Sequence, residues 1–186
     1  MDFESYHNYF EEIVNGSISI HPYNDAQFIE YTKLNFSRQN RWLKHGDLLS
    51  RVMDTIAKIK EVQNWILITE PWCGDAAHSV PFIYKMASLN KHIQLVIQLR
   101  DNHSIIENYL TNGSQSIPIL VARDCVGNDL FVWGPRPSAC QKLHTELKNN
   151  NTSIEELKKT LQFWYNKDKG YSIQLEIEEL LHKTIS

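Results

Sequence analysis

The chain has 186 residues and a formal net charge of −3, with 42% hydrophobic and 22% charged residues. This length is enough for one domain with a buried core, and the composition is that of an ordinary globular protein. The charge gives no electrostatic reason to expect binding to nucleic acid or to an anionic membrane surface.

The N-terminus and the cysteines favour a cytoplasmic protein. Residues 1–13 are acidic and contain no continuous apolar stretch, so they do not resemble a signal peptide. No apolar run approaches the roughly 20 residues that span a bilayer. The three cysteines, Cys73, Cys125 and Cys140, lack metal-binding spacing, and in a reducing compartment we expect free thiols. We expect no membrane partner and no metal, and the oligomeric state stays open.

Residues 1–46 are predicted to form a helical N-terminal extension. Apolar side chains recur at helical spacing over residues 2–14, and an Asn-Gly-Ser stretch ends that helix. A second helix is expected from Asn24 or Asp25, both good N-cap residues, to about His45. A third helix follows Gly46.

Residues 47–150 are predicted to form the core. The apolar runs 64–69 and 93–99 fit buried strands, and residues 75–90 between them fit a helix. Residues 101–113 also indicate a helix, because Asp101 or Asn102 can cap its start and Gly113 can end it.

The end of the core is predicted to be a β-hairpin and a helix. Residues 117–122 and 129–133 are strand-like, and Gly127 with Asn128 supplies the turn between them. A helix then runs from about Pro137 to Asn149. This order predicts an α/β fold with three layers: a small mixed sheet, parallel in its first pair and antiparallel in its last, covered by helices on both faces.

Residues 151–186 are predicted to be a helical tail that packs with the rest as one compact domain. Four apolar residues share a helical face: Ile154, Leu157, Leu161 and Trp164. Gly170 ends this helix. The last stretch alternates like a strand at residues 173–177, but its length and glutamate content favour a helix. We expect the aromatic residues 163–165 to be a docking surface for the tail.

Residues 70–81, EPWCGDAAHSVP, contain the candidate catalytic residue, Cys73. It lies between a buried strand and a helix, where unpaired N–H groups and the helix dipole stabilise a thiolate. Trp72 offers an apolar platform, and Gly74 allows close approach of backbone or partner. Asp75 opposes ionisation, because a neighbouring negative charge raises the pKa of a thiol. The residues alone do not decide which effect dominates.

The stretch PWCGDA resembles the thioredoxin motif Trp-Cys-Gly-Pro-Cys, with Asp75 in place of the proline and Ala76 in place of the second cysteine. Pro81 lies at the offset of the helix-kinking proline of thioredoxins. Ser-Ile-Pro at 116–118 precedes a strand, like the cis-proline of that family. Gly134 follows the hairpin, where thioredoxins carry a glycine that faces the active site.

A closer resemblance covers most of the chain. TEPWCGDA, YLTNGSQSIP and VWGPRP together resemble a bacterial subfamily of thioredoxin-like proteins with a helical N-terminal extension, a helical tail and one motif cysteine.

The resemblance implies a substrate-binding groove beside Cys73. Pro118 would be cis and opposite the cysteine, and the backbone of Ile117 would be free to pair with an extended peptide or a small thiol. Arg136 would lie close enough to stabilise a thiolate or to bind a carboxylate of a small thiol. The implied substrate-binding residues are Trp72, Gly74, Asp75, Ile117, Pro118, Gly134 and Arg136.

Two functions are compatible with these residues. The favoured one is a monothiol oxidoreductase, in which Cys73 forms mixed disulfides with protein or small-thiol disulfides. An external thiol such as glutathione, bacillithiol or another protein would then release it, and no other cofactor is implied. Ala76 excludes a dithiol reductase mechanism within the motif. The alternative is a binding module without redox chemistry, which recognises a peptide or protein in the groove between Trp72, Ile117–Pro118 and Gly134.

The remaining cysteines and histidines are assigned to packing. Cys125 falls in the hairpin turn, far from Cys73, and Cys140 is expected to be buried beyond disulfide distance. His78 follows Cys73 at a spacing that does not share one helical face, which argues against a Cys/His dyad or metal site.

Overall fold

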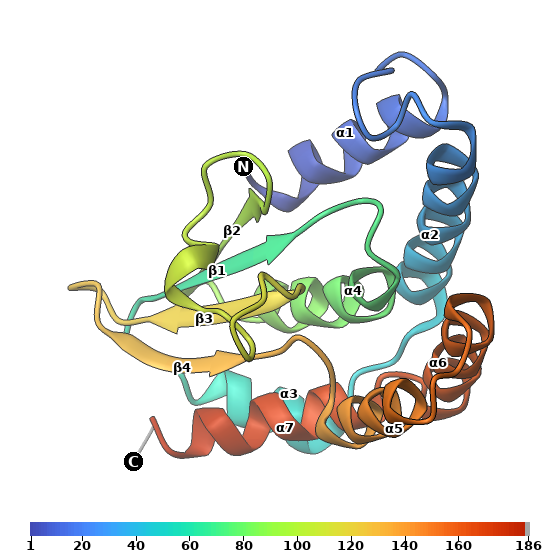
Figure 1. Ribbon diagram of the computed structural model, residues 1–186. Coiled ribbons are helices and arrows are strands. Elements are labelled where there is room, and N and C mark those ends of the chain that lie inside the picture. Colours follow the sequence, from blue (N-terminus) through green and yellow to red (C-terminus); the bar gives the residue numbers. More distant parts are fainter. Residues whose placement is uncertain (185–186) are drawn as a thin grey trace.

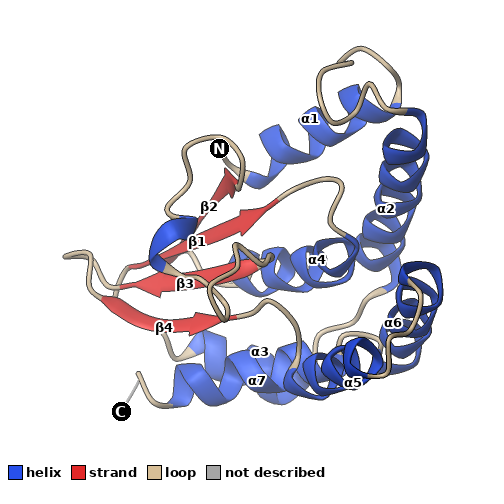
Figure 2. Ribbon diagram, in the orientation of Figure 1, coloured by secondary structure: helices blue, strands red, loops and turns tan. Residues whose placement is uncertain are grey.

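Within residues 1–184, which the computed structural model describes, four strands form one sheet and seven α-helices lie on both sides of it (Figure 1, Figure 2). The strands are β1 (Gln63–Thr69), β2 (Ile93–Leu99), β3 (Ile119–Arg123) and β4 (Asp129–Trp133). The helices are α1 (Phe3–Val14), α2 (Ala26–His45), α3 (Ser50–Ala57), α4 (Gly74–Ser88), α5 (Ser138–Asn149), α6 (Ile154–Asp168) and α7 (Tyr171–His182).

The sheet has the strand order β2-β1-β3-β4. β1 pairs with β2 in parallel, whereas β3 pairs with both β1 and β4 in antiparallel orientation. The central strand β1 is buried along most of its length, as expected for a strand with neighbours on both edges and helices on both faces. The predicted α/β fold of thioredoxin type, with its mixed sheet between helical layers, is therefore confirmed.

The helices of the N-terminal extension begin and end near the predicted residues. Asp25 caps α2 by accepting hydrogen bonds from the backbone N–H groups of Gln27 and Phe28, each at 2.9 Å. Gly46 follows the last residue of α2, where the chain returns to extended backbone. In Figure 1, the C-terminal part of α2 lies next to α6, where Arg41 donates a hydrogen bond to Asn166, so the extension and the tail meet beside the sheet.

The helix predicted over residues 101–113 is wrong. Only a short 3₁₀-helix, η1 (Ile106–Asn108), forms there. His103 and Asn112 have positive φ angles of 53° and 50°, which a right-handed helix does not accommodate. Ile106 is the one buried anchor in this loop, so the segment buries too little apolar surface to hold a longer helix.

One hydrophobic core joins the sheet to both ends of the chain. It includes Phe3, Tyr6 and Phe10 of α1 together with Ile173 and Ile177 of α7. The last helix was therefore predicted correctly. Ile154, by contrast, is 75% exposed and does not belong to a buried face of α6. A second, smaller cluster joins α5 to α6. None of the helices within residues 1–184 combines the length and hydropathy needed to cross a bilayer.

Candidate functional site

Cys73 lies where β1 has ended and α4 begins, as its N-cap residue. Its Sγ accepts a hydrogen bond from the backbone N–H of Ala76 at 3.5 Å and donates one to the carbonyl oxygen of Ile117 at 3.4 Å. The Ile117–Pro118 peptide bond is cis. The thiol is thus held between the start of a helix and the segment that leads into β3.

The resting side chain of Cys73 is a protonated thiol. Only 7% of the residue is exposed. Burial first, and the negative charge of Asp75 second, raise the pKa of Cys73 to about 12, against the lowering effects of the Ala76 N–H and of Arg136. The stabilisation of a thiolate at the start of α4 is therefore smaller than the cost of burying its charge. The donated hydrogen bond to Ile117 fits a thiol rather than a thiolate.

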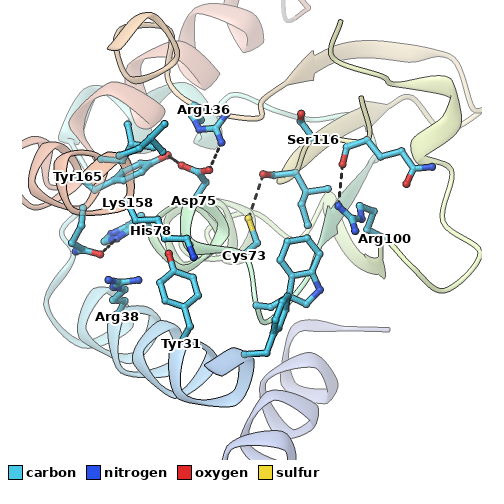
Figure 3. Close-up of a pocket in the computed structure, with 18 of the residues that line it drawn as sticks. Tyr31, Arg38, Cys73, Asp75, His78, Arg100, Ser116, Arg136, Lys158 and Tyr165 are labelled. Carbon is cyan, nitrogen blue, oxygen red and sulfur yellow. Dashed lines mark hydrogen bonds and ion pairs between the residues drawn. The ribbon is translucent and has the colours of Figure 1, made fainter. Parts of the chain in front are cut away.

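The carboxylate of Asp75 is held by two partners. The guanidinium of Arg136 forms an ion pair with it at 2.7 Å, and the Tyr165 hydroxyl donates a hydrogen bond to it at 2.8 Å (Figure 3). The side chain of Arg136 is only 15% exposed, so this ion pair is largely shielded from solvent. Burial raises the pKa of Tyr165, which keeps its proton for Asp75.

A cavity of about 750 Å³ opens beside Cys73. Its walls come from the motif, from the segment before Pro118 and from helices α2 and α6. The residues lining it are Asp25, Gln27, Phe28, Tyr31, Arg38, Trp72, Cys73, Gly74, Asp75, His78, Arg100, Ser114, Gln115, Ser116, Ile117, Arg136, Leu157, Lys158, Leu161, Gln162 and Tyr165. This volume is in the range of small-molecule sites.

The predicted site residues fall into two groups. Trp72, Cys73, Gly74, Asp75, Ile117 and Arg136 all line the cavity. Pro118 and Gly134 are not among the lining residues, and a Cβ at Gly134 would overlap the Pro118 carbonyl oxygen. We expected the backbone of Ile117 to be free to pair with a substrate. Its carbonyl oxygen instead accepts a hydrogen bond from the Cys73 thiol.

His78 also lines the cavity, although its spacing from Cys73 argued against a Cys/His dyad or metal site. Its Nδ1 accepts a hydrogen bond from the Trp42 indole at 2.8 Å, and its Nε2 contacts Gln162 at 3.0 Å. Burial lowers the pKa of His78 to about 3, so the ring is neutral and joins α2, α4 and α6. Within residues 1–184 no group of three or more His, Cys, Asp or Glu side chains could hold a metal ion.

Sequence reasoning missed the residues that the extension and the tail bring to the site. Tyr31 and Arg38 come from α2, and Lys158 and Tyr165 come from α6. Tyr165 was assigned to a docking surface, but it is 5% exposed and bonded to Asp75. No local pattern could have found these residues, because they reach the cavity only through the packing of α2 and α6 around α4.

Comparisons with known proteins agree with this architecture. No functionally curated protein matches the chain. Two solved structures share its fold: an HIV epitope scaffold, with a TM-score of 0.56 and 13% identity over 98% of both chains, and a protein of unknown function from Pseudomonas aeruginosa. The latter has a TM-score of 0.51 and 16% identity over 91% of this chain and 92% of its own.

A match to a family sequence profile shows which protein family the chain belongs to. Residues 22–148, from the N-terminal extension to the end of α5, match the sequence profile of a family described as thioredoxin. The matched segment contains the four strands, Cys73 and the Ile117–Pro118 peptide. The chain therefore belongs to this thioredoxin family.

Proposed function

We propose that this protein is a monothiol member of the thioredoxin-like superfamily, in which Cys73 forms a mixed disulfide that an external thiol releases. One observation carries the proposal: the only cysteine of the motif lies at the start of α4, opposite cis-Pro118, and lines the cavity of about 750 Å³. The single cysteine, the helical extension and the helical tail also favour the single-cysteine subfamily that the sequence resembles.

The reaction would be a two-step disulfide exchange. Cys73 first loses its proton to solvent, and its thiolate attacks one sulfur of a bound disulfide. The disulfide bond breaks, a Cys73–substrate disulfide forms, and the other half leaves as a thiolate. An external thiolate then attacks the substrate sulfur, which forms a new disulfide and returns Cys73 as a thiolate that takes up a proton. Electrons come from the external thiol, because Ala76 cannot supply them.

The protonated resting thiol makes the reaction depend on binding. A thiol whose pKa is raised to about 12 is a poor nucleophile toward a disulfide in free solution. A disulfide held in the cavity would compensate through proximity, since a bound reactant has a high effective concentration. The Ala76 N–H, which already contacts Sγ, and the Arg136 guanidinium would stabilise the thiolate as it forms.

The raised pKa of Cys73 also favours the second candidate, a binding site without redox chemistry. In that case the thiol only packs against Ile117, and the cavity binds a ligand without covalent change. The two candidates differ in one respect: only the first requires the Cys73 sulfur for the protein's action on its ligand.

Trapping the mixed disulfide separates the two candidates. The variant Cys125→Ser removes the exposed cysteine, so that Cys73 and the buried Cys140 remain. This protein is incubated with excess dithiodipropionate, a small disulfide, and its peptides are mapped by mass spectrometry. The proposal expects one adduct per chain, located on Cys73. The double variant Cys73→Ser/Cys125→Ser should acquire none.

Absence of any adduct on Cys73 in the folded protein would overturn the redox proposal. Calorimetry with the same ligand would then test the binding site. Equal heats of binding for Cys73→Ser/Cys125→Ser and Cys125→Ser would support a binding site without redox chemistry.

A further inference from the structure

Cationic side chains outnumber carboxylates in the lining of the cavity. Four cationic side chains line it, namely Arg38, Arg100, Arg136 and Lys158, but only two carboxylates do, Asp25 and Asp75. Arg136 is paired with Asp75 at 2.7 Å. Arg100 is paired with Asp101, which lies outside the lining, also at 2.7 Å. Asp25 is the N-cap of α2 and accepts its hydrogen bonds from that helix.

Arg38 and Lys158 remain without a carboxylate partner among residues 1–184. Arg38 donates to the Asn35 side chain at 2.8 Å, and Lys158 forms no ion pair. Both cations lie against the ring of Tyr31: the Arg38 guanidinium carbon is 5.4 Å and the Lys158 Nζ 4.3 Å from the ring centroid. Cation–π contacts position such groups without neutralising their charge.

Tyr31 also links these two cations to the cysteine motif. A Cβ at Gly74 would overlap the Tyr31 hydroxyl, so the tyrosine touches the residue that follows Cys73. Figure 3 shows Tyr31 and Arg38 on α2, with Lys158 reaching from α6 toward the Tyr31 ring. The cations and the sulfur therefore belong to one site.

The low exposure of Cys73 within the cavity favours a small partner over the surface of a folded protein. Helices α2 and α6 flank it and are tied together by the Arg41–Asn166 hydrogen bond and by the Lys158–Tyr31 contact. Cys73 is only 7% exposed, so the surface of a folded protein does not reach its sulfur. A molecule that enters the cavity, in contrast, can meet the thiol and both cations at once.

We propose that the cavity binds a small disulfide that carries carboxylate groups, with a carboxylate held between Arg38 and Lys158 and a sulfur beside Cys73. This substrate class rests on the proposed function, since the exchange step at Cys73 is the one described above. Arg38 can bind a carboxylate through two parallel N–H groups, and Lys158 adds a second, more mobile cation. The recognition comes from the extension and the tail rather than from the motif.

Three disulfides of similar length and different charge test the proposal: dithiodipropionate with two negative charges, its neutral diamide, and cystamine with two positive charges. The rate of adduct formation on Cys73 is measured in the Cys125→Ser protein for each disulfide. Each rate is divided by the rate of the same disulfide with 2-mercaptoethanol, which removes differences in leaving-group reactivity. The normalised rates should fall in the order dianion, neutral, dication.

Two neighbouring lysines of α6 give a matched pair of variants. Lys158→Gln should lower the normalised rate of the dianion about three- to fivefold, as expected for the loss of one partly exposed ion pair, and leave the neutral disulfide unchanged. Lys159→Gln removes the same charge from the same helix, but Lys159 pairs with Glu155 away from the cavity lining, so no rate should change. Arg38→Gln should act like Lys158→Gln.

The outcomes separate this inference from the proposed function. Equal normalised rates for the three disulfides, or equal effects of Lys158→Gln and Lys159→Gln, would overturn the carboxylate site while leaving the exchange reaction in place. If no disulfide reacts, calorimetry with Cys73→Ser/Cys125→Ser decides: binding of dithiodipropionate that weakens with Lys158→Gln supports the carboxylate site, and absence of binding overturns it.

Discussion

Burial and the negative charge of Asp75 both raise the pKa of Cys73. Together they outweigh the lowering effect of the N–H groups at the start of α4. The sequence left these opposing effects undecided, because burial of the thiol depends on side chains far away in the chain. Tyr31 of α2 packs over Gly74 of the motif. The carbonyl oxygen of Ile117 accepts a hydrogen bond from the Cys73 thiol. The thiol is therefore held in its protonated form at neutral pH.

Reaction of Cys73 with iodoacetamide should show the raised pKa directly. In the Cys125→Ser protein we expect the rate to increase about tenfold per pH unit from pH 7 to 10 without a plateau, because the thiolate fraction is still rising. Asp75→Asn removes a negative charge and frees Arg136, so the pKa of Cys73 should fall and the rate at pH 8 should rise up to about tenfold. A plateau below pH 9 in the Cys125→Ser protein would show that the thiolate is already formed, contrary to this environment.

At the scale of elements, the connection between β4 and α5 is fixed by close backbone contact. Gly134 has φ of +127°, and a Cβ there would overlap the Pro118 carbonyl oxygen. The resemblance implied a glycine that faces the active site, whereas Gly134 is not among the cavity-lining residues and instead lies against Pro118 and Ile119. This contact ties the end of the hairpin to the start of β3.

Gly134→Ala should therefore destabilise the protein strongly. We expect a loss of at least about 3 kcal/mol in the free energy of unfolding, measured by urea denaturation, because positive φ and steric overlap act together. Gly127→Ala is the matched control: its φ is +96°, but nothing lies within 4 Å of the added Cβ. Its loss should stay near about 1–2 kcal/mol. Similar losses for both variants would mean that the Pro118 contact contributes little.

The elements themselves were largely predictable, and the exception has a physical reason. Strands β1 and β2 and helices α2 and α5 carry strong periodicity, caps or turn residues, so their bounds are close to those expected. Residues 101–113 have a cap and a terminator but only one buried anchor, Ile106, and the chain turns at His103 instead. Capping signals identify where a helix can begin, but packing decides whether it forms.

At the scale of the whole molecule, the N-terminal and C-terminal helices complete both the core and the cavity. The sequence predicted their helical character, and it placed them around a thioredoxin-like core. It could not show that α2 and α6 meet across the motif, because that contact joins residues more than a hundred positions apart, as in Arg41 and Asn166. The cavity residues that α2 and α6 supply were therefore not predicted from the sequence.

The tail helix α7 should be as important for stability as a core strand. Ile177 is fully buried and belongs to the main core, so Ile177→Ala should lower the free energy of unfolding by about 2–5 kcal/mol. Ile154→Ala, in α6, removes the same atoms from a residue that is 75% exposed, and the loss should be below about 0.5 kcal/mol. Equal losses in urea denaturation would show that α7 packs less tightly than the structure indicates.

We propose that Cys73 cycles between a thiol and a mixed disulfide, and one measurement tests this cycle most directly. The most direct measurement isolates the Cys125→Ser protein loaded with dithiodipropionate, adds a small external thiol and follows the intact mass with time. We predict that the adduct on Cys73 is released, that the original mass returns, and that the same protein can be loaded again. No adduct on Cys73, or an adduct that the external thiol does not remove while the protein stays folded, would contradict the claim.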